Sequence, residues 1–219
     1  MTSARGMESS DVKAVGGTPY NVAVSTNDIE RYFAEDVPNA KQWVRSLPGG
    51  DALDRLRCDL DDAWPGGCSA KKDAEGRPYH IGLGRVMAGP TQWSQGFVHV
   101  DELAPMSPTK GHFSANLYLK LPSEGGHLEL WPLQFESRWE FYTNAHTLSK
   151  LVSIDEEAQR ELRARLPPPI VLEVAPGDLV MLSVQRPHAV QGWTSGDVRA
   201  SLQSFVNFAG DDAALTLEA

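Results

Sequence analysis

From residue 78 onward, the chain consists mainly of short runs rich in β-branched, aromatic and aliphatic residues. Turn-forming stretches such as GP, SEGG, APGD and TSGD separate most of these runs. The runs are YHIGLGRVM, GFVHVDEL, HFSANLYLKL, HLELWPL, IVLEVA, LVMLSV, HAVQGW and RASLQSFVNF. One helix interrupts them at 153–166, so the alternation of strands and helices that builds a parallel sheet is missing. The pattern therefore predicts a mainly β fold, either a sandwich or a jelly roll.

The part of the chain before residue 78 has a different character. Residues 1–17 are small and polar, which predicts a tail. A short strand is predicted at 18–25. A helix is expected to start directly after it, with Asn27 as the N-cap and Glu30 completing a capping box.

A second N-terminal helix is predicted at 49–64, because leucines recur there at helical spacing with charged residues between them. We therefore divide the 219 residues into a tail with a helical support region, 1–77, and a catalytic core, 78–219. The length suits one integrated domain containing both parts. The N-terminal helices could also form the interface of a homodimer.

Charge and composition exclude several classes of partner. The formal net charge is -9 and the pI is near 5.1, which argues against nucleic acid and against an anionic membrane surface. No run of about 18 apolar residues predicts a membrane span. The two cysteines are too few for a disulfide scaffold, and the start of the chain lacks the apolar core of a secretory signal. We therefore expect a cytoplasmic protein.

Three residues form a candidate metal site. His99 and Asp101 are two residues apart in FVHVDEL, and His188 follows much later in RPHAVQGW. Residues i and i+2 of a strand point to the same face, so the first two can reach one ion. Two imidazoles and one carboxylate leave coordination positions open, as in non-haem Fe(II) oxygenases. For each histidine taken alone, the alternative is a surface position or a hydrogen-bonded position in the core.

A polar stripe follows the third candidate ligand. Arg199, Ser201 and Gln203 alternate with Ala200 and Leu202 in a predicted strand, so one face is polar at three successive positions. A buried arginine needs an anionic partner, and a dicarboxylate would provide one through a two-pronged contact. The alternative is an internal arginine–aspartate pair on an outward-facing strand.

These motifs together resemble the Fe(II)/2-oxoglutarate-dependent dioxygenase superfamily. The motifs are HVD (99–101), SANLYLKLPSEGGHLELWP (114–132), APGDLVML (175–182), RPHAVQGW (186–193) and RASLQSF (199–205). The resemblance implies a mainly β double-stranded β-helix (jelly roll) in which His99, Asp101 and His188 bind Fe(II). It also implies that Arg199 pairs with the distal carboxylate of the cosubstrate 2-oxoglutarate, and that Ser201 adds a hydrogen bond.

Within the superfamily, the stretch LYL…GGHLELW is similar to small amino-acid-modifying hydroxylases and to the related carrier-free halogenases. The halogenases carry a small residue where this chain has Asp101, so the resemblance implies hydroxylation. The expected substrate is a small molecule, a free or N-substituted amino acid, which reacts with O2 and 2-oxoglutarate.

Side chains that contact the substrate are expected around the metal. The candidates are Glu102, Arg85, Arg138, Trp131 and Gln203. Glu102 could hold an ammonium group and the arginines could hold a carboxylate, whereas solvated rim charges are the alternative. The aromatic residues of 131–150 could cover the site as a lid or pack in the core.

Three other functions remain open. The first is a tailoring oxygenase of a bulkier natural product. The second is a metal cupin that does not use 2-oxoglutarate, for which a dicarboxylate clamp at Arg199 would be unnecessary. The third is a non-catalytic jelly-roll module, which the complete set of candidate ligands argues against.

Overall fold

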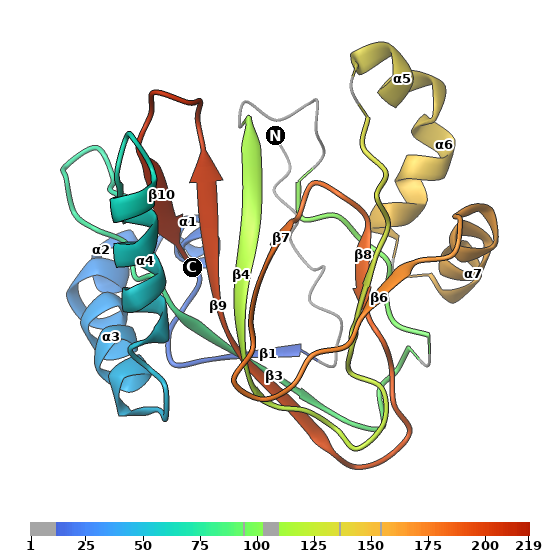
Figure 1. Ribbon diagram of the computed structural model, residues 1–219, viewed down its shortest axis with the longest axis horizontal. Helices are drawn as coiled ribbons and strands as arrows, with labels where there is room; N and C mark the ends of the chain where they lie inside the picture. Colours follow the sequence, from blue (N-terminus) through green and yellow to red (C-terminus); the bar gives the residue numbers. More distant parts are fainter. Residues whose placement is uncertain (1–11, 94, 103–109, 136, 154) are drawn as a thin grey trace.

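The computed structural model describes residues 12–93, 95–102, 110–135, 137–153 and 155–219. Two mainly antiparallel sheets form its centre, with helices on the outside (Figure 1). The strands are β1 (Val12–Val15), β2 (Cys68–Ala70), β3 (Leu83–Ala88), β4 (Gly111–Lys120), β5 (Leu128–Leu130), β6 (Ile170–Leu172), β7 (Leu179–Ser183), β8 (His188–Val190), β9 (Val198–Phe208) and β10 (Leu215–Glu218).

The helices fall into an N-terminal group and a group inserted between β5 and β6. They are α1 (Tyr20–Thr26), α2 (Ile29–Arg31), a π-helical segment (Tyr32–Asp36), α3 (Val37–Ser46), α4 (Ala52–Ala63), α5 (Arg138–Thr143), α6 (Ala145–Leu148), a 3₁₀ turn (Ser149–Val152) and α7 (Glu156–Arg165). Within the described ranges, no helix combines the length and the apolarity needed to cross a membrane.

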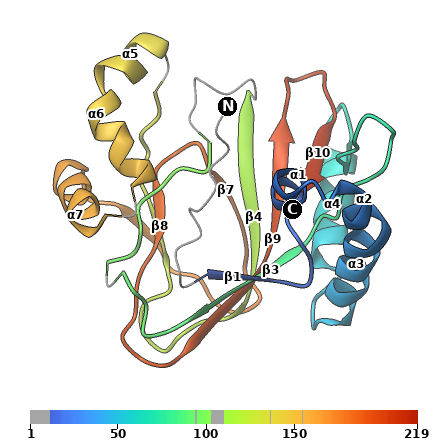
Figure 2. The ribbon, with the colours of Figure 1, turned by 180° about the vertical axis from the view of Figure 1, so that it is seen from behind.

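The long strand β9 organises the large sheet. It pairs with β4 along one edge, and β7 continues the sheet beyond β4. Along its other edge, β9 pairs first with β3 and then with β10. β1 lies beside β3 at the bottom of the view in Figure 2, and β2 adds to β10 in the one parallel pairing among the described strands. The sheet is therefore held together by a single strand of 11 residues.

The small sheet has the order β6-β5-β8 and lies opposite the large one, with α5, α6 and α7 on its outer side (Figure 1). An isolated antiparallel bridge joins His188, the first residue of β8, to His99. This bridge connects the segment before residue 103 to the small sheet.

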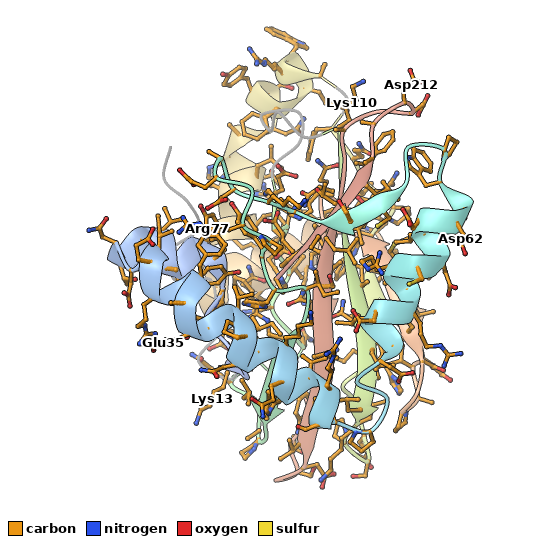
Figure 3. The ribbon with its side chains drawn as sticks, turned by 90° about the vertical axis from the view of Figure 1, so that its left-hand side faces the viewer. Lys13, Glu35, Asp62, Arg77, Lys110 and Asp212 are labelled. Carbon is orange, nitrogen blue, oxygen red and sulfur yellow. The ribbon has the colours of Figure 1, made fainter. Side chains whose placement is uncertain are left out.

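Helices α3 and α4 lie side by side over one face of the large sheet (Figure 3). Leu53 of α4 and Val44 of α3 pack against Leu117 and Leu202 of the sheet. Further along, the leucines of α4 contact a cluster that includes Val206 of β9. The predicted amphipathic helix is thus present, and its apolar side faces the sheet as its spacing requires.

Strand alternation gives the large sheet two different faces. On β9, Leu202 and Val206 point toward the helices, whereas Arg199, Ser201 and Gln203 line a cavity on the opposite side. The polar stripe predicted from the sequence therefore lies on one face of this strand, as its two-residue period requires.

Local predictions fail at several positions. The strand predicted at 18–25 is largely the helix α1, and Asn27 is the C-cap of that helix with a φ of 57°, not an N-cap. The predicted tail reaches residue 17, yet Val12–Val15 forms β1 because it finds an open edge on β3. The strand predicted around His99 is reduced to its single bridge with His188. The outcomes at β1 and at His99 depend on partners that are distant in sequence.

Candidate metal centre

A cavity of about 180 Å³ lies between the two sheets. β3, β4 and β9 of the large sheet line it, together with β8 and the segment around residues 91–101. The charged or imidazole side chains in its lining are Arg85, His99, Asp101, His188 and Arg199. Among the described residues, Asp101 is the only carboxylate in this lining, beside two arginines. The cavity therefore suits ligands that carry negative charge.

His99, Asp101 and His188 converge in this cavity. Their ligand atoms all lie within 4.8 Å of one another, so the three side chains form a group that can hold a metal ion. The Asp101 carboxylate lies between the rings: Oδ1 is 3.7 Å from Nε2 of His99, and Oδ2 is 3.8 Å from Nε2 of His188. The ring centroids are 4.3 Å apart. The predicted convergence is therefore present, although only the bridge at His99 is strand-like.

The backbone fixes the orientation of both rings. Nδ1 of His99 lies 3.0 Å from the carbonyl oxygen of Phe97, and Nδ1 of His188 lies 2.9 Å from that of Arg186. A carbonyl oxygen can only accept a hydrogen bond, so each neutral ring carries its proton on Nδ1. The Nε2 lone pairs then point toward the shared centre. This arrangement is typical of histidine ligands whose second nitrogen is held by a neighbouring group.

Burial keeps His188 neutral. Desolvation, reinforced by the neighbouring His99, lowers the pKa of His188 to about 4, and Asp101 opposes this change only in part. A neutral imidazole has a free lone pair, which is the form that binds a metal.

Arg199 is buried on the same cavity wall. It is 4% exposed, its Nε donates to the carbonyl oxygen of Gly126 at 3.1 Å, and its guanidinium lies over the ring of Tyr118 at 5.1 Å. Among the described residues, no carboxylate pairs with it. Burial accordingly lowers the pKa of Arg199. The alternative of an internal arginine–aspartate pair therefore finds no support in the described part of the chain.

Ser201 lies two residues further along the same face. It is 2% exposed, and its Oγ has no hydrogen-bond partner within the described residues. A buried hydroxyl without a partner is unusual, because it loses its hydrogen bonds to water without replacement. Arg199 and Ser201 together offer a cation and a hydroxyl to an anion in the cavity.

A chain of polar side chains continues along the same cavity wall. Nε of Arg85 donates to Oε1 of Gln203 at 2.8 Å, and Nε2 of Gln203 donates to Oγ of Ser114 at 2.9 Å. Nδ2 of Asn116 also donates to Ser114 Oγ, at 2.8 Å. β3, β4 and β9 are adjacent strands, so their cavity-facing residues lie in one row. Arg85 and Gln203 are therefore held in fixed positions beside Ser201.

Three of the predicted substrate-binding residues lie outside this lining. Glu102 accepts a hydrogen bond from Gln185 at 3.1 Å and lies 3.3 Å from Nδ1 of His112. Arg138 is exposed at the start of α5. Trp131 is 1% exposed in a core cluster, where its Nε1 donates to the carbonyl oxygen of Pro167 at 2.8 Å.

The structure also adds cavity residues that sequence reasoning did not single out. Met87 and Trp93 line the cavity, and so does Val12 of β1, which had been assigned to the tail. Phe97 stacks against the ring of His99, with centroids 5.5 Å apart. Strand alternation around Arg85 could have identified Met87. No local signal indicates Val12 or Trp93, because both reach the cavity through long-range packing.

Neither the family models nor the curated proteins compared with the sequence gave a match. Several solved structures match, and two of them are similar to this chain over most of its length. An N-substituted L-amino acid dioxygenase from Burkholderia ambifaria AMMD, in complex with alpha-KG, gives a TM-score of 0.55 at 16% identity, over 93% of this chain and 74% of that chain. A second structure of such a dioxygenase from the same organism gives a TM-score of 0.53, with the same identity and coverage. At this identity the similarity concerns the fold, and it agrees with the resemblance that the motifs carry.

Proposed function

We propose that this protein is an Fe(II)- and 2-oxoglutarate-dependent dioxygenase that hydroxylates a small molecule. One observation carries the proposal: the candidate ligand triad faces the same cavity as a buried arginine that pairs with no carboxylate among the described residues. A metal cupin that does not use 2-oxoglutarate would explain the triad but would leave Arg199 without a function. The proposal also assigns the two sheets to a double-stranded β-helix, in keeping with the fold of the similar dioxygenase.

The donor set fits Fe(II). His99 and His188 would bind through Nε2, and Asp101 through its carboxylate, which makes a two-histidine, one-carboxylate set with open positions. With O2 and 2-oxoglutarate, the bound iron would supply the oxidation: one oxygen atom enters a substrate C–H bond and the other enters succinate, with release of CO2. The surrounding residues hold the reactants and exclude water.

The anion-binding groups fit 2-oxoglutarate. Arg199 would hold the distal carboxylate with its guanidinium, and the orphaned Oγ of Ser201 would donate a further hydrogen bond to it. An anion would give the buried cation the partner that the described residues do not supply. Arg199 and the triad line one cavity, as a dicarboxylate that binds both the arginine and the metal would require.

We assign the substrate to the free or N-substituted amino acids. Arg85 would hold the substrate carboxylate, and Gln203 fixes the position of Arg85 through its 2.8 Å hydrogen bond. Met87, Trp93 and Phe97 offer apolar contacts for the rest of the molecule. The similar dioxygenase acts on N-substituted L-amino acids, which supports the same class here.

The direct test has two stages. First, protein loaded anaerobically with Fe(II) should develop a visible charge-transfer absorption band when 2-oxoglutarate is added. No band, with no measurable 2-oxoglutarate binding, would refute the proposal. Second, succinate release in air is measured with a panel of N-substituted amino acids and the carboxamide of each. Faster turnover of the acids would support a contact between the protein and the substrate carboxylate. Equal turnover of acids and carboxamides would contradict such a contact.

Two matched variants separate the candidate arginines. Arg85→Ala should raise the substrate KM and leave uncoupled 2-oxoglutarate turnover intact, since Arg85 lines the cavity but is not assigned to the cosubstrate. Arg138→Ala serves as the control, because its exposed side chain at the start of α5 should change neither quantity. If only Arg138→Ala raised the substrate KM, the residue that contacts the substrate carboxylate would be Arg138 on α5 and not Arg85.

A further inference from the structure

The segment that carries His99 is paired on one side by a single bridge. His99 N–H donates to the carbonyl oxygen of His188 at 3.0 Å, and His188 N–H donates back to that of His99 at 2.9 Å. No further strand pairing extends this bridge among the described residues. Two residues further on, the N–H of Asp101 donates to the carbonyl oxygen of Val184 at 3.0 Å. Val98, the residue directly before His99, takes no part in either contact.

Helix α7 supports the backbone of Val98 through Gln159. The side-chain Oε1 accepts the N–H of Val98 at 2.8 Å, and Nε2 donates to the carbonyl oxygen of Val98 at 3.0 Å. One amide thus bonds both backbone groups of the residue before His99, as a neighbouring strand would. Nε2 also contacts the carbonyl oxygens of Lys150 and Ser153, at 3.0 and 3.1 Å.

The contact is built into the core. Gln159 is 3% exposed, although it lies on a largely polar helix, and Val98 is 0% exposed. A buried backbone N–H and C=O must be paired, and Gln159 is the described partner of both. Loss of this side chain would leave two buried polar groups of Val98 without hydrogen bonds.

A second residue of α7 extends the same contact by one helical turn. Arg163 donates through Nη2 to the carbonyl oxygens of Gln95 and Gly96, the latter at 3.0 Å. The same atom lies 2.8 Å from Oε2 of Glu129 in β5, and the guanidinium lies 5.4 Å from the ring centroid of Trp131. Residues i and i+4 of a helix share one face, so Gln159 and Arg163 act together on the segment.

We propose that Gln159 is a positioning residue for the metal ligand His99: its amide takes the place of a strand neighbour and fixes the backbone from which the imidazole projects. The inference rests on the proposed function, since it concerns iron binding by the triad. Trp131 belongs to the same arrangement, because its ring packs against the guanidinium of Arg163 in the core beneath α7.

The test measures metal affinity and does not need turnover. Gln159→Met keeps the length of the side chain and removes all its hydrogen bonds. Its affinity for Mn²⁺, an Fe(II) substitute measured by electron paramagnetic resonance of the free ion, should fall roughly 10- to 100-fold, as for outer groups that orient a ligand. Hydrogen exchange at the amides of Val98 and His99 should accelerate in the same variant.

Two controls separate positioning from general loss of stability. Leu53→Ala removes a side chain that is 1% exposed beneath the opposite face of the large sheet, and Arg160→Ala changes an exposed neighbour on α7. Both should keep the Mn²⁺ affinity of the parent protein at temperatures where they are folded. The inference about Gln159 would be overturned if Gln159→Met bound Mn²⁺ as tightly as the parent protein, or if Leu53→Ala lost as much Mn²⁺ affinity as Gln159→Met. Neither result would contradict the proposed function. Absence of Mn²⁺ binding in the parent protein would overturn both the inference and the proposed function.

Discussion

Each face of the large sheet carries deeply buried residues of β9, and the chemistry of these residues differs between the two faces. Leu202 and Val206, which face the helices, are 0% and 1% exposed, while Arg199 and Ser201, which face the cavity, are 4% and 2% exposed. On the helix face, Leu202 and Val206 belong to two apolar clusters that include residues of α3 and α4. On the cavity face, the cation has no carboxylate partner and the hydroxyl has no hydrogen-bond partner among the described residues.

Burial alone therefore does not distinguish a core from a candidate site. The distinguishing feature is whether buried groups are satisfied. Residues of the helix face gain stability from apolar contacts, whereas those of the cavity face lose hydrogen bonds to water that a bound ligand would replace. The comparison predicts that substitutions on the helix face lower stability, and that substitutions on the cavity face lower binding or activity.

The largest effect is expected at the metal ligand. Asp101→Ala should reduce substrate-dependent succinate release by more than the roughly 10–100-fold effect of outer-shell groups, because it removes a ligand itself. The free energy of unfolding of the metal-free protein should change little, since the Asp101 side chain is 30% exposed. Succinate release and urea denaturation measure the two quantities. Retained activity would remove Asp101 from the cavity chemistry.

Leu202→Ala tests the opposite face of the same sheet. The substitution leaves a void between α3, α4 and the sheet, and should lower the free energy of unfolding by about 2–5 kcal/mol. Affinity for 2-oxoglutarate should stay at the parental value, because the side chain points away from the cavity. Denaturation midpoints and equilibrium binding below the unfolding temperature check both parts. If the variant kept its stability but lost 2-oxoglutarate binding, the assignment of separate roles to the two faces would be wrong.

Arg199→Met replaces the buried cation by an apolar side chain of similar length. The loss of a charge-assisted contact worth about 1.5–3 kcal/mol should weaken 2-oxoglutarate binding roughly 10- to 100-fold. Stability should stay equal or rise, since apolar replacements of buried ions are often neutral or stabilising. Calorimetric titration and thermal unfolding provide the measurements. A large loss of stability with unchanged binding would assign Arg199 to the core.

Ser201→Ala should give the smallest effect. A single hydrogen bond from a hydroxyl to a carboxylate should contribute about 1.5 kcal/mol, the lower end of the range for charged groups, so 2-oxoglutarate binding should weaken roughly 10-fold. Unfolding stability should not decrease, because Oγ has no described partner to lose. The matched control is Ser204→Ala, on the face of β9 that is turned toward the helices. Oγ of Ser204 is buried and lies 3.5 Å from the carbonyl oxygen of Glu218, so its removal should leave 2-oxoglutarate binding unchanged. Equal binding by both variants would place Ser201 outside the anion site.

The features that depend on local periodicity can be predicted from the amino-acid sequence. A strand repeats every two residues, so Arg199, Ser201 and Gln203 had to share one face. Helical spacing likewise indicated α4, and acidic residues followed by arginines indicated α7, as the helix dipole favours. The spacing of His99 and Asp101 indicated a shared ligand site, although the strand assumed for it is largely absent.

Contacts between distant groups, in contrast, are visible only in the folded chain. The fold brought His188 beside His99 through the bridge of β8, and it placed Val12 of the expected tail in the cavity wall. Trp131 and Arg138 both lie in the predicted lid segment 131–150. In the fold, Trp131 is buried in the core beneath α7, whereas Arg138 is exposed. In the sequence, Gln159 is not distinguishable from the other polar residues of α7. Its function is indicated only by the hydrogen bonds between its amide and the backbone of Val98. Such pairings depend on contacts between segments far apart in the chain, and local residue patterns carry no information about them.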